Sequence, residues 1–194
     1  MLHCVTRIIA GAAGSLRLEV PKAGTRPTSD RVREAIFSAL DSWDIVRGSR
    51  VLDLYAGSGA LGLEAASRGA AEIALVEKHP QAAQVAARNA KLVEGSFRGE
   101  DRPRVTVARS SVQHYLETAS GDRFDIVMLD PPYDLSDRAL AADLALVEAL
   151  LAPGGVVMVE RSIRAPEPQW PTSLERLREK RYGETAVWWA ELRS

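Results

Sequence analysis

The stretch Val51-Leu52-Asp53-Leu54-Tyr55-Ala56-Gly57-Ser58-Gly59-Ala60-Leu61-Gly62 decides the fold of this chain. It begins as an apolar strand, which runs directly into a turn that contains Gly57 and Gly59. Glycine lets the backbone turn tightly and lets a ligand come close to it. Apolar residues then recur at helical spacing, so a helix is expected to direct its first N–H groups and the positive end of its dipole at that ligand. The stretch therefore predicts the strand–loop–helix unit of an α/β fold.

Two acidic residues narrow what this loop would hold. The loop by itself could bind a dinucleotide or S-adenosylmethionine, or could simply pack. Asp53 lies four residues before the first glycine, which favours a cationic ligand over a pyrophosphate. The next predicted strand ends in Glu77, about twenty residues after the loop, where an acidic side chain accepts a hydrogen bond from a ribose hydroxyl. The alternative for Glu77 is a solvated strand end, which the position after the glycine loop disfavours.

A second loop, Asp130-Pro131-Pro132-Tyr133, follows the apolar run 124–129. Its prolines fix φ and remove two N–H donors, so the backbone there can only accept hydrogen bonds. These carbonyls and the Asp130 carboxylate suit an amino group, while Tyr133 offers a face to a planar base. The alternative is an ordinary strand-ending turn, because Asp-Pro often opens turns.

The rest of the chain alternates between strand and helix patterns. Strands are expected at 50–55, 72–77, 104–108, 124–129, 155–160, 178–182 and 185–192, and helices at 59–68, 80–93, 111–118 and 137–151. This alternation predicts an α/β fold with a seven-stranded, mostly parallel sheet and helices on both faces. The turn at Gly183-Glu184 leaves no room for a helix, so the last strand must be antiparallel.

Residues 1–42 are expected to form an N-terminal extension, and residues 43–194 the main domain. A hairpin is expected over 5–20, a loop over 21–28, and then a helix capped by Ser29 or Asp30. Between residues 5 and 35 there are six basic and three acidic side chains. This local surplus suggests a surface for nucleic acid, although such a patch can also be an ordinary solvated face.

Parallel strands bring their carboxyl ends to one edge of a sheet. The glycine loop, Glu77, Ser110-Ser111, the Asp130 loop and Arg161 should therefore meet there. Ser111 or the Val112 N–H could bond a base, or Ser111 could cap the next helix.

The length and composition of the chain limit the number of domains and the kinds of protein that it can be. A chain of 194 residues with 46% hydrophobic and 26% charged residues can build one full α/β core. It has no apolar run of membrane-spanning length, and its single cysteine, Cys4, and three scattered histidines offer no disulfide or metal site. A reducing cytoplasm is the simplest location.

These motifs together resemble class I S-adenosylmethionine-dependent amino-methyltransferases. The segments Thr25–Phe37, Asp53–Ala65 and Asp130–Tyr133 resemble, more narrowly, the bacterial RsmD family, and the resemblance extends over nearly the whole chain. It implies a Rossmann-like methyltransferase that transfers a methyl group from S-adenosylmethionine to N2 of guanine 966 in 16S rRNA and releases S-adenosylhomocysteine. It also implies a substrate in the 30S subunit or an assembly intermediate. The chain is expected to act as a monomer and without a metal.

The resemblance and the motifs assign roles to particular residues. The catalytic residues would be Asp130, Pro131, Pro132 and Tyr133. The cofactor would be held by Asp53, Tyr55, Ala56, Gly57, Ser58, Gly59, Glu77, Lys78, Ser111, Val112 and Asp130. The RNA would be held by Arg7, Arg17, Arg26, Thr28, Arg31, Arg33 and Arg161.

Other functions remain open at this point. An adenine-N6 DNA methyltransferase shares the Asp130 loop but typically carries a separate recognition domain, for which the chain has little space. A glutamine-N5 protein methyltransferase usually has Asn where Asp130 stands. A nicotinamide dehydrogenase is disfavoured by Asp53 and by the antiparallel last strand. A non-catalytic rRNA-binding module is the alternative from a different class.

Overall fold

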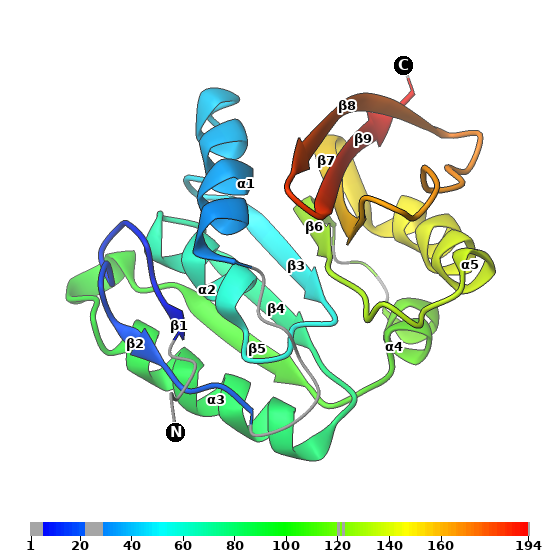
Figure 1. Cartoon of the computed structure of the whole chain (residues 1–194). Helices are drawn as coiled ribbons and strands as arrows, with labels where there is room; N and C mark the ends of the chain where they lie inside the picture. The colour runs from blue at the N-terminus through cyan, green and yellow to red at the C-terminus, as the bar shows by residue number, and fades with distance from the viewer. Residues whose placement is uncertain (1–5, 22–28, 120, 122, 194) are drawn as a thin grey trace.

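A seven-stranded sheet organises the molecule (Figure 1). The computed structural model describes residues 6–21, 29–119, 121 and 123–193. The strands of this sheet are β3 (Arg50–Leu54), β4 (Glu72–Val76), β5 (Arg104–Ala108), β6 (Phe124–Leu129), β7 (Leu151–Ser162), β8 (Leu174–Tyr182) and β9 (Thr185–Leu192). The helices are α1 (Asp30–Ser42), α2 (Ala60–Ser67), α3 (Pro80–Glu94), α4 (Val112–Thr118) and α5 (Asp137–Val147), with short 3-10 helices at Gly99–Asp101 and Glu148–Leu150.

The strand order is β5-β4-β3-β6-β7-β9-β8, and the five strands from β5 to β7 are parallel. Strand β9 is antiparallel to both β7 and β8. This confirms the predicted sheet and its antiparallel last strand. The chain runs from β3 outward to β5 and then returns to β6 on the other side of β3. Such a reversal point is where open α/β sheets bind ligands.

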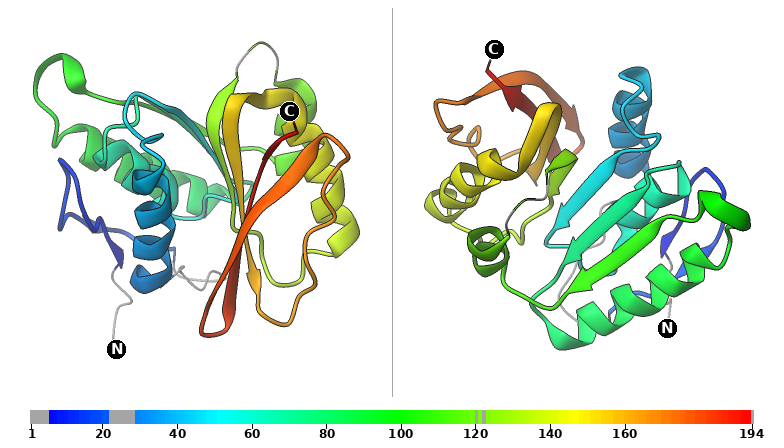
Figure 2. Two further views of the ribbon diagram at one scale, coloured as in Figure 1. Left: turned by 90° about the horizontal axis from the view of Figure 1, so that it is seen from above. Right: turned by 180° about the vertical axis from the view of Figure 1, so that it is seen from behind.

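Helices cover the two faces of the sheet in separate layers, as Figure 2 shows. One core lies under α1, α2 and α3 and includes Met128, Met158 and Trp189 of the sheet. The other lies under α4 and α5 and includes Leu129, Val159 and Trp188. Neighbouring residues of one strand thus fall into different cores, as the alternation of side chains along a strand requires.

The N-terminal segment is a short antiparallel hairpin of β1 (Thr6–Arg7) and β2 (Arg17–Leu18), followed by α1. Ser29 caps α1 by accepting a hydrogen bond from the Val32 N–H at 3.3 Å, as predicted. Ile8 and Leu18 of the hairpin are buried in the same core as α1 and the first face of the sheet. The N-terminal extension therefore shares a core with the main domain.

Several boundaries differ from the predicted ones. Strand β7 begins at Leu151, because Leu151 already pairs with Phe124 before the register shifts. The predicted helix at 137–151 correspondingly ends at Val147 and tightens into a 3-10 turn. In β8, Leu177 is the extra residue of a bulge between Arg176 and Arg178 and is 41% exposed.

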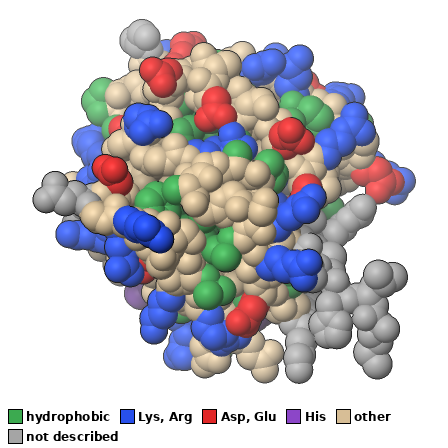
Figure 3. Space-filling view, turned by 90° about the vertical axis from the view of Figure 1, so that its left-hand side faces the viewer, with side chains coloured by type: hydrophobic (Ala, Val, Ile, Leu, Met, Phe, Trp, Pro, Cys, Tyr) green, Lys and Arg blue, Asp and Glu red, His purple; other side chains and the backbone are tan. Residues whose placement is uncertain are grey.

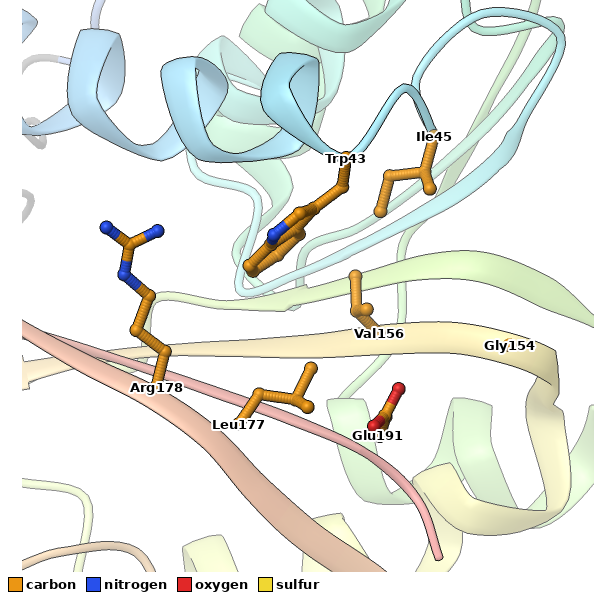
Figure 4. Close-up of a pocket in the computed structure, with 7 residues that line it drawn as sticks. All are labelled: Trp43, Ile45, Gly154, Val156, Leu177, Arg178 and Glu191. Atoms are coloured by element: carbon orange, nitrogen blue, oxygen red, sulfur yellow. The ribbon is translucent and has the colours of Figure 1, made fainter. Parts of the chain in front are cut away.

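A groove of about 410 Å³ lies at the amino ends of the parallel strands (Figure 4). Trp43 and Ile45, which follow α1, face Val156 of β7 and Leu177 of β8 across it. Trp43 packs edge-on against Trp189, with ring centroids 5.1 Å apart. The groove is at the opposite end of the strands from the loops that the sequence singled out.

Candidate active site

The carboxyl ends of the parallel strands surround a cavity of about 820 Å³. It is open to solvent and lies at the reversal point of the sheet. Its walls come from the glycine loop, the end of β4, the Asp130 loop, α3, and the closing hairpin of β8 and β9. The lining residues include Asp53, Tyr55, Ala56, Gly57, Ser58, Glu77, Lys78, Ser110, Val112, Asp130, Pro131, Pro132, Tyr133, Glu160, Tyr182, Glu184 and Thr185. The sequence had placed most of these residues at one edge, and the structure brings them together.

The glycine loop is held by two buried carboxylates. Asp53 accepts a hydrogen bond from the Gly62 N–H at 2.9 Å, and Glu77 accepts one from the Gly57 N–H at 2.9 Å. A Cβ at Gly62 would come within 2.4 Å of Leu75 and 3.2 Å of the Asp53 side chain. Only glycine at this position lets α2 approach the sheet closely enough for the bond to Asp53.

The pKa of Asp53 is raised to about 7, chiefly by burial and also by the nearby carboxylates of Asp130 and Glu77, against the lowering effect of the hydrogen bond from the Gly62 N–H. The side chain is 1% exposed, so water stabilises its charge poorly. A cation in the cavity would supply the missing countercharge.

Glu77 already bonds two backbone groups of the site. Besides Gly57, its carboxylate accepts a hydrogen bond from the His79 N–H at 2.7 Å. Each carboxylate oxygen has a second lone pair, so Glu77 can still accept from a hydroxyl at the cavity wall. Lys78 lies next to it in the same wall.

The structure reveals a buried pair that the sequence analysis missed. The Tyr55 hydroxyl donates a hydrogen bond to Asp143 of α5, and Tyr55 has a positive φ of 63°. Burial raises the pKa of both side chains, and the bond also raises that of Tyr55 while lowering that of Asp143. The bond holds Tyr55 of the glycine loop on α5. Asp143 occurs among Leu140, Leu144 and Val147 on the apolar face of its helix, and that placement was the available signal.

The Asp130 loop presents its tetrapeptide at the mouth of the cavity. Pro131 is buried, whereas Tyr133 is 66% exposed, so an aromatic ring stands in solvent beside Asp130. Arg161 of β7 braces the end of this loop by donating to the Leu135 carbonyl at 3.4 Å and to Asp137 at 3.0 Å. The Arg161 side chain is 9% exposed and its place is internal, which argues against the predicted phosphate contact.

Ser111 has the capping role that the sequence left open. Its hydroxyl accepts a hydrogen bond from the His114 N–H at 3.3 Å, at the start of α4. Ser110 and Val112 line the cavity on either side of it.

The predicted RNA-binding residues differ in exposure. Arg7, Arg17 and Arg31 are exposed, and Arg26 and Thr28 lie outside the described residues. Arg33 was expected to contact phosphate, but its side chain is 1% exposed. It bonds Asp30 at 2.8 Å and the Arg7 carbonyl, and it lies 3.9 Å from Glu64. The prediction for Arg33 is wrong, because the hairpin covers its guanidinium.

Two buried polar residues fasten the hairpin to the cavity wall, and the sequence analysis missed both. Glu64 of α2 accepts hydrogen bonds from the N–H groups of Ile9 at 2.7 Å and Ala10 at 3.1 Å. Asn89 of α3 donates to the carbonyl of Ser58 and to that of Glu19, both at 2.9 Å. The exit of the hairpin is thereby tied to the glycine loop itself.

Among the described residues, no group of three or more His, Cys, Asp or Glu side chains is placed to hold a metal ion. No helix in the same part of the chain is long and apolar enough to cross a bilayer.

The cavity residues fit S-adenosylmethionine. Two buried carboxylates, Asp53 and Glu77, and the half-buried Asp130 give the cavity a negative wall suited to a sulfonium cation. Glu77 would take the ribose hydroxyls, and the first turn of α2 with its glycine loop would take the remaining polar groups.

An α/β sheet with an antiparallel last strand, and a carboxylate-walled cavity at its reversal point, define this chain as a class I methyltransferase. A hypothetical protein of Thermus thermophilus superimposes with a TM-score of 0.80 and 34% identity, over 97% of this chain and 100% of that one. The 16S rRNA N2 G1207 methyltransferase RsmC of T. thermophilus, solved with AdoMet and guanosine, has the same fold, with a TM-score of 0.66 and 23% identity over 97% of this chain and 50% of that one.

Sequence comparison gives the family. The family model described as conserved hypothetical protein 95 matches residues 6–191. The Ribosomal RNA small subunit methyltransferase D of Escherichia coli K12 is 35% identical over 182 residues, which covers 93% of this chain and 86% of that protein. The chain belongs to this RsmD family.

Proposed function

We propose that this chain transfers a methyl group from S-adenosylmethionine to the exocyclic N2 of a guanine in 16S rRNA. The target would be guanine 966, as the family resemblance implies. The observation that carries the proposal is that Asp130 lines the same cavity as the buried carboxylate Asp53 and the exposed ring of Tyr133.

The relatives support an rRNA substrate. The E. coli relative is named as a methyltransferase of small-subunit rRNA. RsmC of T. thermophilus, which has the same fold, is named as an N2 methyltransferase of G1207 in 16S rRNA. The 30S subunit, or an intermediate in its assembly, would be the substrate particle, and the enzyme would act as a cytoplasmic monomer.

The side chains at the mouth suit an amino group that is a weak nucleophile. The lone pair of the guanine N2 is delocalised into the ring, so its reaction needs positioning and electrostatic support more than a strong base. Asp130 and the Pro131 carbonyl would accept the amine hydrogens and turn the lone pair toward the cavity. Tyr133 would stack on the base, which must leave its RNA stack to enter.

Bound S-adenosylmethionine would supply an electrophilic methyl group on a sulfonium. Asp53 and Glu77 would hold the cofactor, together with the glycine loop from Tyr55 to Gly59, Lys78 and Val112. As the amine gains positive charge, the Asp130 carboxylate would stabilise it and then share in the release of its proton.

The test is methyl transfer from labelled S-adenosylmethionine to unmodified 30S particles, free 16S rRNA and duplex DNA, with the modified base mapped. We expect transfer to a guanine N2 in rRNA. Transfer to adenine in duplex DNA would support an adenine-N6 DNA methyltransferase instead, and binding of rRNA without cofactor binding would support a non-catalytic module.

Asp130→Ala should lower turnover by about a hundredfold or more, because its contacts form with the reacting amine, while the affinity for the neutral product S-adenosylhomocysteine, measured by calorimetry, stays nearly unchanged. Tyr133→Phe should lower turnover only slightly, since stacking needs only the ring. Tyr133→Ala should weaken both turnover and the use of RNA severely. An Asp130→Ala enzyme with normal turnover would contradict the role given to this carboxylate.

A further inference from the structure

Glu160 lies directly beside Asp130 at the carboxyl edge of the sheet. Leu129 of β6 pairs with Val159 of β7 in parallel register, so the residues that follow them, Asp130 and Glu160, are neighbours across the two strands. Adjacent strands lie about 4.8 Å apart. Figure 1 shows β6 and β7 side by side where this edge is formed.

Both side chains point to the same face. Met128 and Met158, two residues earlier in each strand, belong to the core under α1, α2 and α3. Because side chains alternate along a strand, Asp130 and Glu160 project on that face as well. It is also the face of Asp53, which pairs with Met128.

Glu160 is 8% exposed and yet lines the cavity. Tyr182 and Thr185 of the closing hairpin form the wall next to it. Glu77 and the glycine loop lie on the other side of Asp130, because the strand order is β4-β3-β6-β7. The cavity therefore continues past Asp130, away from the residues assigned to the cofactor, and its lining there includes a buried carboxylate.

We propose that Glu160 reads the Watson–Crick edge of the target guanine by accepting a hydrogen bond from its N1–H, while Asp130 accepts from the N2 amino group. This inference rests on the proposed function and names a specificity-determining residue for it. Guanine presents these two donors side by side, and two neighbouring carboxylates match them. Adenine presents an acceptor, N1, beside its amino group, and a buried carboxylate would repel that lone pair. A site built for a donor rejects an analogue that places a lone pair at the same position, because the carboxylate then meets that lone pair in place of an N–H.

The experiment separates the two contacts with nucleosides as competitive inhibitors of 30S methylation. Guanosine has both donors, inosine keeps N1–H but lacks the N2 amino group, and 2-aminopurine riboside keeps that amino group but lacks N1–H. The inhibition constants would be measured for the wild-type protein and for Glu160→Gln, Glu160→Asp and Asp130→Asn. Glu117→Gln is the matched control, since Glu117 is exposed on α4 in the opposite layer. Calorimetry with S-adenosylhomocysteine would confirm that each variant folds.

The wild-type protein should prefer guanosine to 2-aminopurine riboside by about tenfold or more, the effect of one hydrogen bond to a charged acceptor. Glu160→Gln should remove this preference, and Glu160→Asp should retain part of it. Asp130→Asn should instead weaken the preference for guanosine over inosine, and Glu117→Gln should change neither.

An unchanged guanosine preference in Glu160→Gln would overturn the inference, and so would a failure of guanosine to compete in the wild-type protein. Either result leaves the proposed function standing if the mapped product is a methylated guanine N2. If no methyl group reaches guanine at all, the proposed function itself fails.

Discussion

At the residue scale, the carboxyl group of Asp53 is almost fully buried and has a raised pKa. Burial raises its pKa to about 7, which means that the folded protein holds this proton more tightly than the unfolded chain does. Between about pH 4 and about pH 7, Asp53 stays protonated in the folded protein while it ionises in the unfolded chain, so its contribution to the free energy of unfolding falls as pH rises. The charged form of Asp53 therefore lowers the stability of the folded protein unless a cation lies beside it.

This carboxyl group predicts a pH-dependent preference between two cofactor forms. Asp53 is neutral below about pH 7 and charged above it, so the affinity for the cation S-adenosylmethionine should rise between about pH 6 and pH 8 relative to the neutral thioether S-adenosylhomocysteine. Calorimetry with both ligands across this pH range measures how much the sulfonium group contributes to the affinity, since the rest of the two molecules is the same. Asp53→Asn should make the affinities for the two ligands depend on pH in the same way. Parallel curves for the wild-type protein would show that Asp53 does not sense the sulfonium.

At the scale of elements, the N-terminal hairpin is a fastened part of the cavity wall. Besides the bonds to Glu64 and Asn89, the Ala12 N–H donates to the Ser67 carbonyl at 2.8 Å and the Ala13 N–H to the Ser67 hydroxyl at 2.9 Å. Gly11 sits at the point of closest approach, with a φ of 85°, and a Cβ there would lie 1.9 Å from the Ser67 carbonyl oxygen. The hairpin can dock in this way only with glycine at position 11.

Gly11→Ala should therefore detach the hairpin. We expect the amides of Ile9 and Ala10 to lose their protection from hydrogen exchange, and methylation of 30S particles to fall by about tenfold or more, with cofactor affinity nearly unchanged. Gly154→Ala is the control, because Gly154 has a similar φ of 76° but nothing within 4 Å of its Cβ position. If the detached hairpin left methylation at the wild-type rate, the segment would be a structural brace without a part in docking RNA.

At the scale of the whole molecule, a nearly neutral protein presents one face with many basic side chains. The formal net charge is −1, yet the face that carries the hairpin bears many Lys and Arg side chains, with Asp and Glu between them (Figure 3). Arg7, Arg17 and Arg31 remain exposed in this region, whereas Arg33 is enclosed by the hairpin. The cationic surface available to RNA is smaller than the sequence suggested.

Arg31 and Arg33, both on α1, provide a matched comparison of the two environments. Arg31→Ala should reduce the slope of log affinity against log salt for 16S rRNA by about one unit, the effect of one lost phosphate contact. Arg33→Ala should remove the hydrogen bonds of the buried guanidinium to Asp30 and to the Arg7 carbonyl and lower the free energy of unfolding by about 1–3 kcal/mol, while Glu64 keeps its ion pair with Arg68 at 2.8 Å. The salt dependence of rRNA affinity and unfolding in urea, measured for both variants, test these two expectations. A lower salt slope in a stable Arg33→Ala protein would restore Arg33 as a phosphate contact.

The local sequence pattern was sufficient to predict the strands of the sheet and the edge of the sheet at which the site forms. The apolar runs, the glycine loop and the turn at Gly183 predicted seven strands and the direction of the last one, because strand and helix periodicities and turn residues act over a few positions. The convergence of the glycine loop, Glu77 and the Asp130 loop also followed, since all parallel strands end at the same edge.

Only the tertiary structure decided which distant side chains meet and which are buried. Strand order and register make Glu160 the neighbour of Asp130, and the docked hairpin turns Arg33 and Glu64 into an enclosed pair. The packing of α5 likewise brings Asp143 to Tyr55. No local pattern encodes these contacts, because the partners are separated by tens of residues and their burial depends on every element packed over them.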